Sequence, residues 1–297
     1  MISEFAPAKV NLTLHITGQR EDGYHLLDSL VVFADIGDRI DIFEANTLSL
    51  TVEGAEAQGV PADMSNSILK AATFFNPQAA GAAFLLTKNL PSAAGIGGGS
   101  ADAAAALRGL LRHWEADAEA LFPKGLDLAK LTEAETARLA AKAKTLGADV
   151  PVCLFSHPAR MRGIGADLTF IRDLPPLHAV MVNPRVAVST PDVFKAITDK
   201  SNPAMPDVPE FEDASALIKW LAAQRNDMQP AAMSLFPKIG DVIAALEAQP
   251  SCQLARMSGS GATCFGLFPD AKSAQNAASK IQESNPSWWV RNCLLVG

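Results

Sequence analysis

The segment PSAAGIGGGSADAAAALRGLL, residues 91–111, constrains the fold more than any other part of the chain. Four of five consecutive positions in it are glycine, and an alanine-rich run follows. Because alanine has the highest helix propensity, the run predicts a helix from about Ala101, with Ser100 as N-cap and Asp102 in the first turn. Glycine amides ahead of a helix can bind an anion, so the segment predicts a phosphate loop. Taken alone, it fits a connector equally well.

Two familiar phosphate motifs do not fit this segment. A Walker A loop requires a lysine directly after the last glycine, and Ser100 stands there instead. A dinucleotide fingerprint has the spacing G-x-G-x-x-G after an early strand, whereas here the glycines are closer together and begin at Gly95. The phosphate-binding interpretation that remains is a loop that binds a nucleoside triphosphate through its backbone amides.

Composition narrows the class of protein. The chain has 297 residues, 48% of them hydrophobic, which is enough for one large domain or two modest ones. The formal net charge of -7 does not suggest a nucleic-acid partner. No run of 18 apolar residues predicts a membrane span, and the start lacks the apolar core of a secretory signal. The four cysteines form no C-x-x-C pair, so we expect free thiols and a cytoplasmic protein.

The order of elements predicts two halves. Near the start, four apolar residues alternate with polar ones and indicate one strand, with Val10, Leu12, Leu14 and Ile16 on one face and Asn11, Thr13 and His15 on the other. Further alternating runs make this half β-rich, and AAFLLTKNLP predicts a strand before the glycine segment. After about residue 160, HAVMVNP predicts a strand, TPDVFKAI a helix and Ser201 to Asp213 a loop. Two helices, a strand pair around a glycine turn, a helix and a last strand follow.

Two polar residues suit phosphoryl transfer to an alcohol. Lys9 precedes the first alternating run, and Asp149 lies between a predicted helix end and the apolar, strand-like run VPVCLF. A carboxylate can accept or orient the hydroxyl proton while an ammonium stabilises developing negative charge. Periodicity alone favours a solvated lysine and an ordinary turn aspartate, so this pattern does not establish either role.

The remaining signals are weaker. The second glycine turn, SGSGAT at Ser258–Thr263, fits an ordinary hairpin as well as a functional loop. The five histidines show no spacing typical of a dedicated zinc site, and no residues are assigned to a metal.

Three segments together resemble the GHMP kinases, the relatives of galactose, homoserine, mevalonate and phosphomevalonate kinases. PAKVNLTLHITGQREDGYH, SAAGIGGGSADAA and SGSGATCFG resemble the three motifs of that family, in order. The first segment, together with LGADVPV, is similar to members that act on a cytidine diphosphate-linked methylerythritol. The similarity extends from Pro7 to about Phe268, and three ordered motifs are far more specific than one glycine loop.

The resemblance implies an α/β (α+β) fold of two domains with the active-site cleft between them. Residues 1–160 would form a mixed, β-rich ATP-binding domain, and residues 161–297 a ferredoxin-like domain. It also implies phosphorylation by ATP with Mg²⁺ of the 2-hydroxyl of the cytidine diphosphate-linked alcohol, a step of non-mevalonate isoprenoid synthesis. Alternatives are a GHMP kinase for another alcohol, a silent nucleotide-binding relative and a dehydrogenase. The partners are these small molecules, and oligomeric state is left open.

The same resemblance implies the site residues. Asp149 would be the base and Lys9 its electrostatic partner. The substrate would lie near Asn11, Tyr24, His25, Thr190 and Phe194. The ATP phosphates would lie along the second motif, at Ser92, Ala93, Ala94, Gly95, Ile96, Gly97, Gly98, Gly99, Ser100, Ala101 and Asp102.

Overall fold

The computed structural model describes residues 1–75, 81–113, 133–165 and 167–296. Contacts divide the chain into two compact units. The first contains residues 1–8, 37–92 and 97–156, and the second contains residues 9–36, 93–96 and 157–297. Two long strands, β1 (Ile2–Asn11) and β3 (His25–Glu44), contribute residues to both units. The domain boundary expected after residue 160 stays a prediction.

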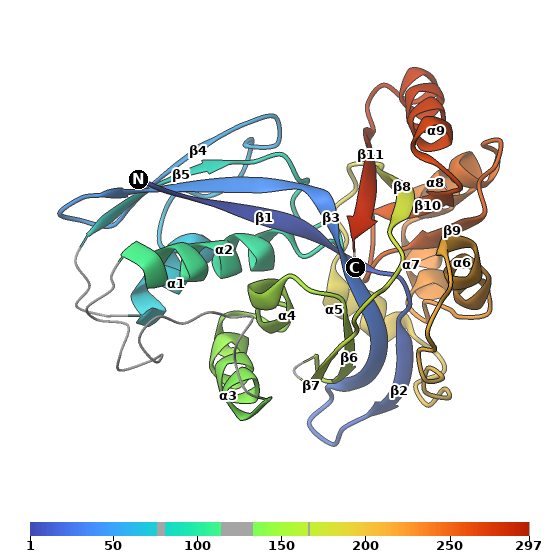
Figure 1. Cartoon of the computed structure of the whole chain (residues 1–297), viewed down its shortest axis with the longest axis horizontal. Coiled ribbons are helices and arrows are strands. Elements are labelled where there is room, and N and C mark those ends of the chain that lie inside the picture. Colours follow the sequence, from blue (N-terminus) through green and yellow to red (C-terminus); the bar gives the residue numbers. More distant parts are fainter. Residues whose placement is uncertain (76–80, 114–132, 166, 297) are drawn as a thin grey trace. The chain divides into compact units, whose positions relative to one another are not determined.

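The first unit is a sheet covered by helices (Figure 1). The end of β3 pairs antiparallel with β5 (Ala82–Thr87), and β4 (Ser49–Glu53) pairs parallel with β5. α1 (Ser67–Phe75) packs against α2 (Gly98–His113), and α2 packs against α4 (Val150–Phe155). α3 (Glu133–Ala143) and a 3₁₀ turn at Lys144–Leu146 precede α4. Small alanines on α2 are almost fully buried, which allows this close packing.

Two local predictions in the first unit are wrong. α2 begins at Gly98 rather than near Ala101, because Gly97 accepts the first helical bond from the amide of Ala101 at 2.7 Å. Ser100 is therefore inside the first turn and is not the N-cap. The run after Asp149 is the helix α4 and not a strand: all six of its residues are buried, and a short, wholly apolar run carries no period that separates the two.

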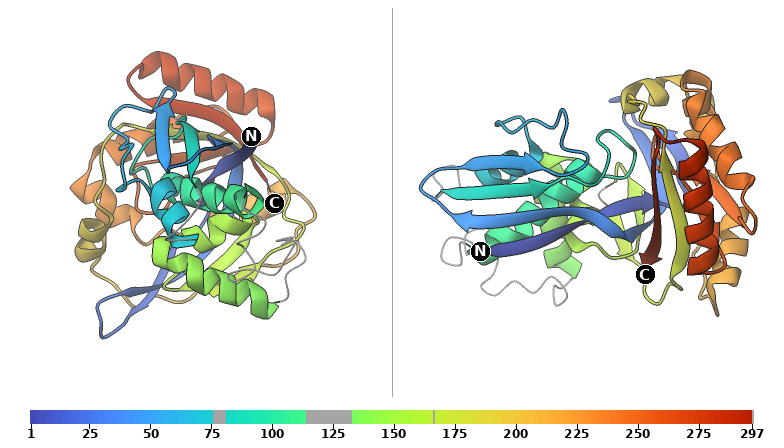
Figure 2. Two further views of the ribbon diagram at one scale, coloured as in Figure 1. Left: turned by 90° about the vertical axis from the view of Figure 1, so that its left-hand side faces the viewer. Right: turned by 90° about the horizontal axis from the view of Figure 1, so that it is seen from above.

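The second unit contains a ferredoxin-like arrangement, as predicted. β8 (Leu177–Asn183), β9 (Leu254–Met257), β10 (Cys264–Phe268) and β11 (Trp289–Val296) form an antiparallel sheet in the order β11-β8-β10-β9. α9 (Ala271–Ser284) packs against β11 and β8, and α8 (Lys238–Glu247) packs against β10 and β9. Both helices cover one face of this sheet (Figure 2), which completes the βαββαβ pattern.

The second unit has further strands and helices besides this sheet. β2 (His15–Gln19) and β6 (Ala159–Gly163) each pair antiparallel with β3, and β7 (Asp167–Phe170) pairs with β6. Between β8 and β9 lie α5 (Thr190–Ala196), α6 (Ala214–Ala222), α7 (Gln229–Leu235) and α8. The segment from Ser201 to Asp213 contains neither helix nor strand, as predicted. Among the described residues, no helix has the length and apolar character needed to cross a bilayer.

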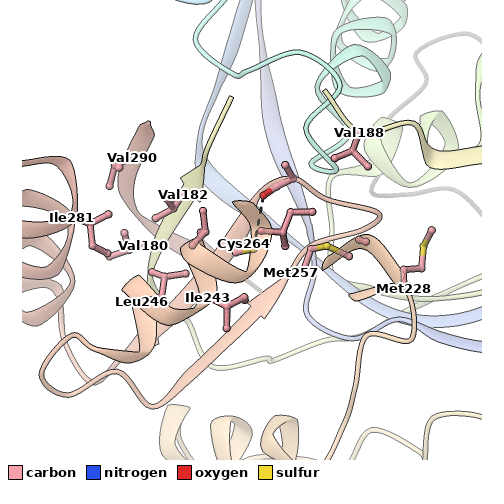
Figure 3. Close-up of a cluster of buried hydrophobic side chains, with 14 of the residues drawn as sticks. Val180, Val182, Val188, Met228, Ile243, Leu246, Met257, Cys264, Ile281 and Val290 are labelled. Carbon is pink, nitrogen blue, oxygen red and sulfur yellow. Dashed lines mark hydrogen bonds between the residues drawn. The ribbon is translucent and has the colours of Figure 1, made fainter. Parts of the chain in front are cut away.

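One apolar core lies under the ferredoxin-like sheet. It joins the inward residues of β8, β10 and β11 to those of α8 and α9, and Figure 3 shows Val180, Val182, Leu246, Ile281 and Val290 pointing into it. Cys264, on β10, is in the same cluster and is buried, and the four cysteines are free thiols, as expected.

The alternating run near the start forms two strands where one was predicted. β1 ends at Asn11 and β2 begins at His15. Between them, Leu14 pairs with a different segment: its amide donates to the carbonyl of Arg225 at 2.9 Å. Asn11, Thr13 and His15 are at most 1% exposed, so the polar face of this run is as buried as its apolar face. Its polar groups must therefore find partners inside the protein.

Candidate active site

In the second unit, the first, second and third motif segments meet through hydrogen bonds. The amide of Asn11 donates to Ser258 Oγ at 3.0 Å, and that hydroxyl donates to the carbonyl of Gly95 at 3.1 Å. The amide of Lys9 donates to the carbonyl of Ile96 at 3.0 Å. The lysine is only 3% exposed, so it is not the solvated surface residue that periodicity alone favoured. One serine of the glycine turn thus connects the other two motifs.

Glycine is required where the second and third motifs touch. Gly95 has φ +73°, and a Cβ built on it would lie 2.6 Å from the carbonyl oxygens of Ser258 and Gly261. Gly259 has φ +56°, and its Cβ would lie 2.7 Å from the carbonyl oxygen of Gly95. Any side chain at either position would force the two backbones apart. The third motif is therefore more than an ordinary hairpin turn, because it fixes the path of the glycine segment.

The second motif is exposed at its start and again at Gly99, and it is buried in between at Ala94 and Ile96. Ser92 and Ala93 are exposed, and Ala93 adopts a left-handed φ of +50° without being glycine. In the first unit, Gly99 is exposed at the start of α2, while Ala101 and Asp102 are buried. Backbone amides at the start of α2 can therefore be approached by an anion, whereas the side chain of Asp102 faces the protein interior.

Asp102 belongs to a buried cluster of three charges in the first unit. Lys88 Nζ donates to Asp102 Oδ2 at 2.8 Å and also to Asp38, and all three side chains are at most 4% exposed. Asp38 Oδ1 accepts the amides of Asn89 at 2.6 Å and Leu90 at 2.9 Å. The cluster therefore ties the end of β5 to the first turns of α2, on either side of the glycine segment.

Burial and the neighbouring charges shift the pKa values of this cluster. Burial raises the pKa of Asp102 to about 7, with Lys88 opposing that shift and Asp38 adding to it. For Lys88, burial by itself disfavours the charged form, but the two carboxylates outweigh it and raise the pKa above its usual value. A Cβ built on Gly98 would lie 3.3 Å from Lys88 Nζ. The positive charge of Lys88 is therefore next to the backbone of the glycine segment, on its buried side.

Asp149 lies in the first unit, at the start of α4. It is the residue that precedes this helix, and it is partly exposed. Gly147, two residues before Asp149, is close to the first turn of α2, since a Cβ built on it would lie 3.7 Å from Ser100 Oγ. The segment that carries the expected base therefore runs beside the segment expected to bind phosphates.

The second unit holds the residues expected near the substrate. Thr190 Oγ1 and Ser260 Oγ are 2.7 Å apart, which places the start of α5 beside the third motif. The ring of His25 stacks on that of Phe194, with centroids 4.6 Å apart and an angle of 15° between the planes. Burial lowers the pKa of His25, and its buried Nε2 has no hydrogen-bond partner within the described part of the chain. Tyr24 is 64% exposed, in the turn between β2 and β3.

The structure gives contacts to four residues for which the sequence had indicated no role. Lys88, Ser29, Ser258 and Ser260 each bond to an expected site residue. A lysine that ends an otherwise apolar strand, directly before the glycine segment, was the only signal for Lys88. Among the described residues, no group of three His, Cys, Asp or Glu side chains could hold a metal ion.

Comparisons with known proteins define the class. The family model of the GHMP kinases N terminal domain matches residues 66–157, and that of the GHMP kinases C terminal matches residues 204–287. The chain therefore belongs to the GHMP kinase family and is a small-molecule kinase.

Individual relatives carry names that are more specific than the family. The chain is 53% identical to a protein named 4-diphosphocytidyl-2-C-methyl-D-erythritol kinase from Roseobacter denitrificans, covering 98% of this chain and 92% of the relative. A protein of the same name from Paramagnetospirillum magneticum is 50% identical, covering 98% and 97%. A crystal structure of 4-(cytidine 5'-diphospho)-2C-methyl-D-erythritol kinase superposes with a TM-score of 0.75 at 31% identity over both full chains. A mevalonate kinase shares the fold alone, with a TM-score of 0.65 at 10% identity and 99% of each chain covered.

Proposed function

We propose that the protein transfers the γ-phosphoryl group of ATP to the 2-hydroxyl of 4-diphosphocytidyl-2-C-methyl-D-erythritol, in the non-mevalonate route to isoprenoid precursors. The relatives' names support the substrate, and their identity extends over nearly the whole chain. The structural observation that carries the chemistry is the placement of the Gly147–Asp149 segment beside Ser100, in the first turn of α2. A base and a phosphate loop are needed together for this transfer.

The proposed reaction is one displacement. Asp149 accepts or orients the proton of the substrate hydroxyl, whose oxygen forms a new bond to the γ-phosphorus while the bond from that phosphorus to the β–γ bridging oxygen breaks. ADP leaves with the electron pair of the broken bond. Amides of the glycine segment bind the phosphates, and Lys9 stabilises the charge that develops. We include Mg²⁺ as the ion that accompanies ATP and neutralises phosphate charge, and we assign no side chain to it.

Substrate recognition is proposed to use the second unit. Tyr24 and Phe194 would hold the cytosine between their faces, and His25 would bind its edge. The structure gives Phe194 one aromatic partner already, the ring of His25. Asn11 and Thr190 would contact the alcohol portion, and the free thiols support a cytoplasmic location.

The substrate is tested by a panel of alcohols. Purified protein with ATP and Mg²⁺ should form ADP with 4-diphosphocytidyl-2-C-methyl-D-erythritol and not with homoserine or mevalonate. Phosphorus NMR of the product should show a new monoester on the 2-oxygen. If another alcohol in the panel is turned over with a higher kcat/KM, the proposed substrate is wrong but the kinase activity stands. Nucleotide binding without any turnover would favour a catalytically silent relative.

The base is tested by Asp149→Asn, which keeps the shape of the side chain but removes its basic oxygen. We expect kcat to fall by roughly 10²–10⁴-fold with a smaller change in KM. Retention of wild-type turnover by this variant would remove Asp149 from the mechanism.

A further inference from the structure

A buried chain of hydrogen bonds begins at Asn11 in the second unit. Asn11 Nδ2 donates to Ser29 Oγ at 2.8 Å, and Ser29 Oγ donates to the carbonyl oxygen of Thr13 at 2.5 Å. Asn11, Thr13 and Ser29 are at most 1% exposed. These hydrogen bonds join the end of β1 to the first part of β3, so two strands hold them in place.

The direction of these bonds follows from chemistry. A backbone carbonyl can only accept, so Ser29 must use its one hydrogen on Thr13. Its oxygen then has only acceptor capacity left, and the side-chain amide of Asn11 must present its nitrogen to it. Ser29 thereby fixes which end of an otherwise nearly symmetrical amide points away. In Asn11 that end is the carbonyl oxygen, Oδ1.

Oδ1 of Asn11 is buried and has no hydrogen-bond partner among the described residues. It lies beside the third motif, 3.4 Å from where a Cβ on Gly259 would stand. The backbone of the same residue is fixed there, because its amide donates to Ser258 Oγ. A buried acceptor without a donor is unfavourable, and a ligand that donates a hydrogen bond to it would remove that penalty.

We propose that Ser29 is a positioning residue that holds the Asn11 carbonyl oxygen toward the bound alcohol, so that this position accepts a hydroxyl group of the substrate. The inference rests on the proposed function and adds a specificity element to it. Phosphate oxygens at neutral pH are acceptors, so an acceptor here favours the polyol over the phosphate portions of either substrate. Thr13 completes the arrangement through its backbone and does not itself need to contact substrate.

The kinetic test is Ser29→Ala in the full chain, assayed with whichever alcohol of the panel the wild-type protein phosphorylates best. With its amide free to turn, Asn11 should hold the hydroxyl less well. We expect kcat/KM for the alcohol to fall about tenfold, equivalent to roughly 1.4 kcal/mol, while the KM for ATP stays within about twofold. In an Asn11→Ala background, Ser29→Ala should have no further effect on kcat/KM, since nothing remains to be positioned.

The matched control is Thr13→Val. Thr13 Oγ1 accepts the amide of Leu30 at 2.9 Å and donates to Met205 Sδ at 3.0 Å, so this variant disturbs the same buried region. It leaves the Thr13 carbonyl that Ser29 uses. We expect lower thermal stability with kcat/KM unchanged. If Thr13→Val reproduces the kinetic loss, or if Ser29→Ala loses ATP and alcohol binding equally, the role of Ser29 is only structural and the proposal is wrong.

A second readout separates this inference from the proposed function. The NMR signals of the Asn11 side-chain amide protons are assigned as those that disappear in Asn11→Ala. These protons should exchange slowly with solvent in the wild type and faster in Ser29→Ala. This comparison needs no turnover. Slow exchange together with a failure to phosphorylate the cytidine substrate would reject the substrate but keep the positioned amide, whereas equal exchange rates in both proteins would overturn the inference itself.

Discussion

Removing the ammonium of Lys88 gives the sharpest test of the charge cluster behind the glycine segment. In Lys88→Met, the carboxylates of Asp38 and Asp102 would face each other inside the protein with no cation between them. Deleting one partner of a buried ion pair costs about 3–5 kcal/mol. Because this one ammonium serves two carboxylates that are 0% and 4% exposed, we expect a loss near the top of that range.

The pH dependence of this loss has a definite sign. In the folded wild type, burial already raises the pKa of Asp102 to about 7, above the ordinary aspartate pKa of 3.8. The folded state thus binds more protons than the unfolded state between these values, and the contribution of Asp102 to stability falls as pH rises through that window. Without Lys88 the carboxyl should take up a proton more readily, so Lys88→Met should recover stability at pH 5.5 relative to pH 7.5.

The assay is urea denaturation at the two pH values, with a conservative reference. Lys238, whose side chain is 65% exposed and pairs with Asp241, is a matched surface lysine, and Lys238→Met should change the unfolding free energy by less than about 0.5 kcal/mol. Adding Asp38→Asn and Asp102→Asn to Lys88→Met should restore most of the loss. The reasoning fails if Lys88→Met costs less than about 1 kcal/mol, or if the neutral triple variant is no more stable than Lys88→Met.

Three further predictions use other parts of the site. Gly98→Val should weaken ATP binding in calorimetry, because a Cβ there would stand 3.3 Å from the buried Lys88 Nζ and a larger side chain would displace the backbone of the glycine segment. In Gly99→Ala the nearest contact of the added Cβ among the described residues outside its own helix is Ser67 Oγ at 3.8 Å, so ATP should bind nearly normally. Wild-type ATP affinity in Gly98→Val would mean that the segment is only a connector. Tyr24→Ala and Phe194→Ala should each raise KM for the cytidine substrate by about ten- to a hundredfold without changing KM for ATP, since a stacked base is worth roughly 1–3 kcal/mol. If KM rises equally for the cytidine substrate and for ATP, the two rings are core residues and do not bind the base. Burial and, less strongly, a neighbouring arginine lower the pKa of His15 below 6.5, so its stability contribution is full above pH 6.5 and is lost at lower pH; His15→Leu should flatten the fall in unfolding free energy between about pH 7 and 5.

Sequence patterns predicted the strands and helices of the second half because each strand there is a short apolar run bounded by clear turns, whereas the ferredoxin-like arrangement was implied only by the resemblance to the GHMP kinases. They did not predict the interior role of Asp102. A helix capped near Ser100 would place that aspartate next to the phosphates, but its neighbours Lys88 and Asp38 are 14 and 64 residues away in the sequence, and only the folded sheet brings them to it. Local propensity carries no information about such pairs.

The polar face of the first alternating run shows the same limit. Asn11, Thr13 and His15 have the spacing of one face of a strand, and alternation normally indicates that such a face meets solvent. Here the face is covered, and Ser29 supplies the partner that makes burial of Asn11 tolerable. The pattern identified which residues share a face but not what covers that face.

The long strand β3 has a consequence for the order in which the chain is made. Every residue of the first unit has been synthesised once residue 156 is added, so that unit can be completed early. Residues 33 and 34 of β3, however, pair with Val296 and Leu295 at the far end of β11. At about 5–20 residues per second, a ribosome would need roughly 10–50 s between the two. Throughout that interval this edge of β3 in the nascent chain is apolar and unpaired with β11. The yield of folded protein in the cell should therefore depend more on chaperones that shield this edge than on the stability of the folded enzyme.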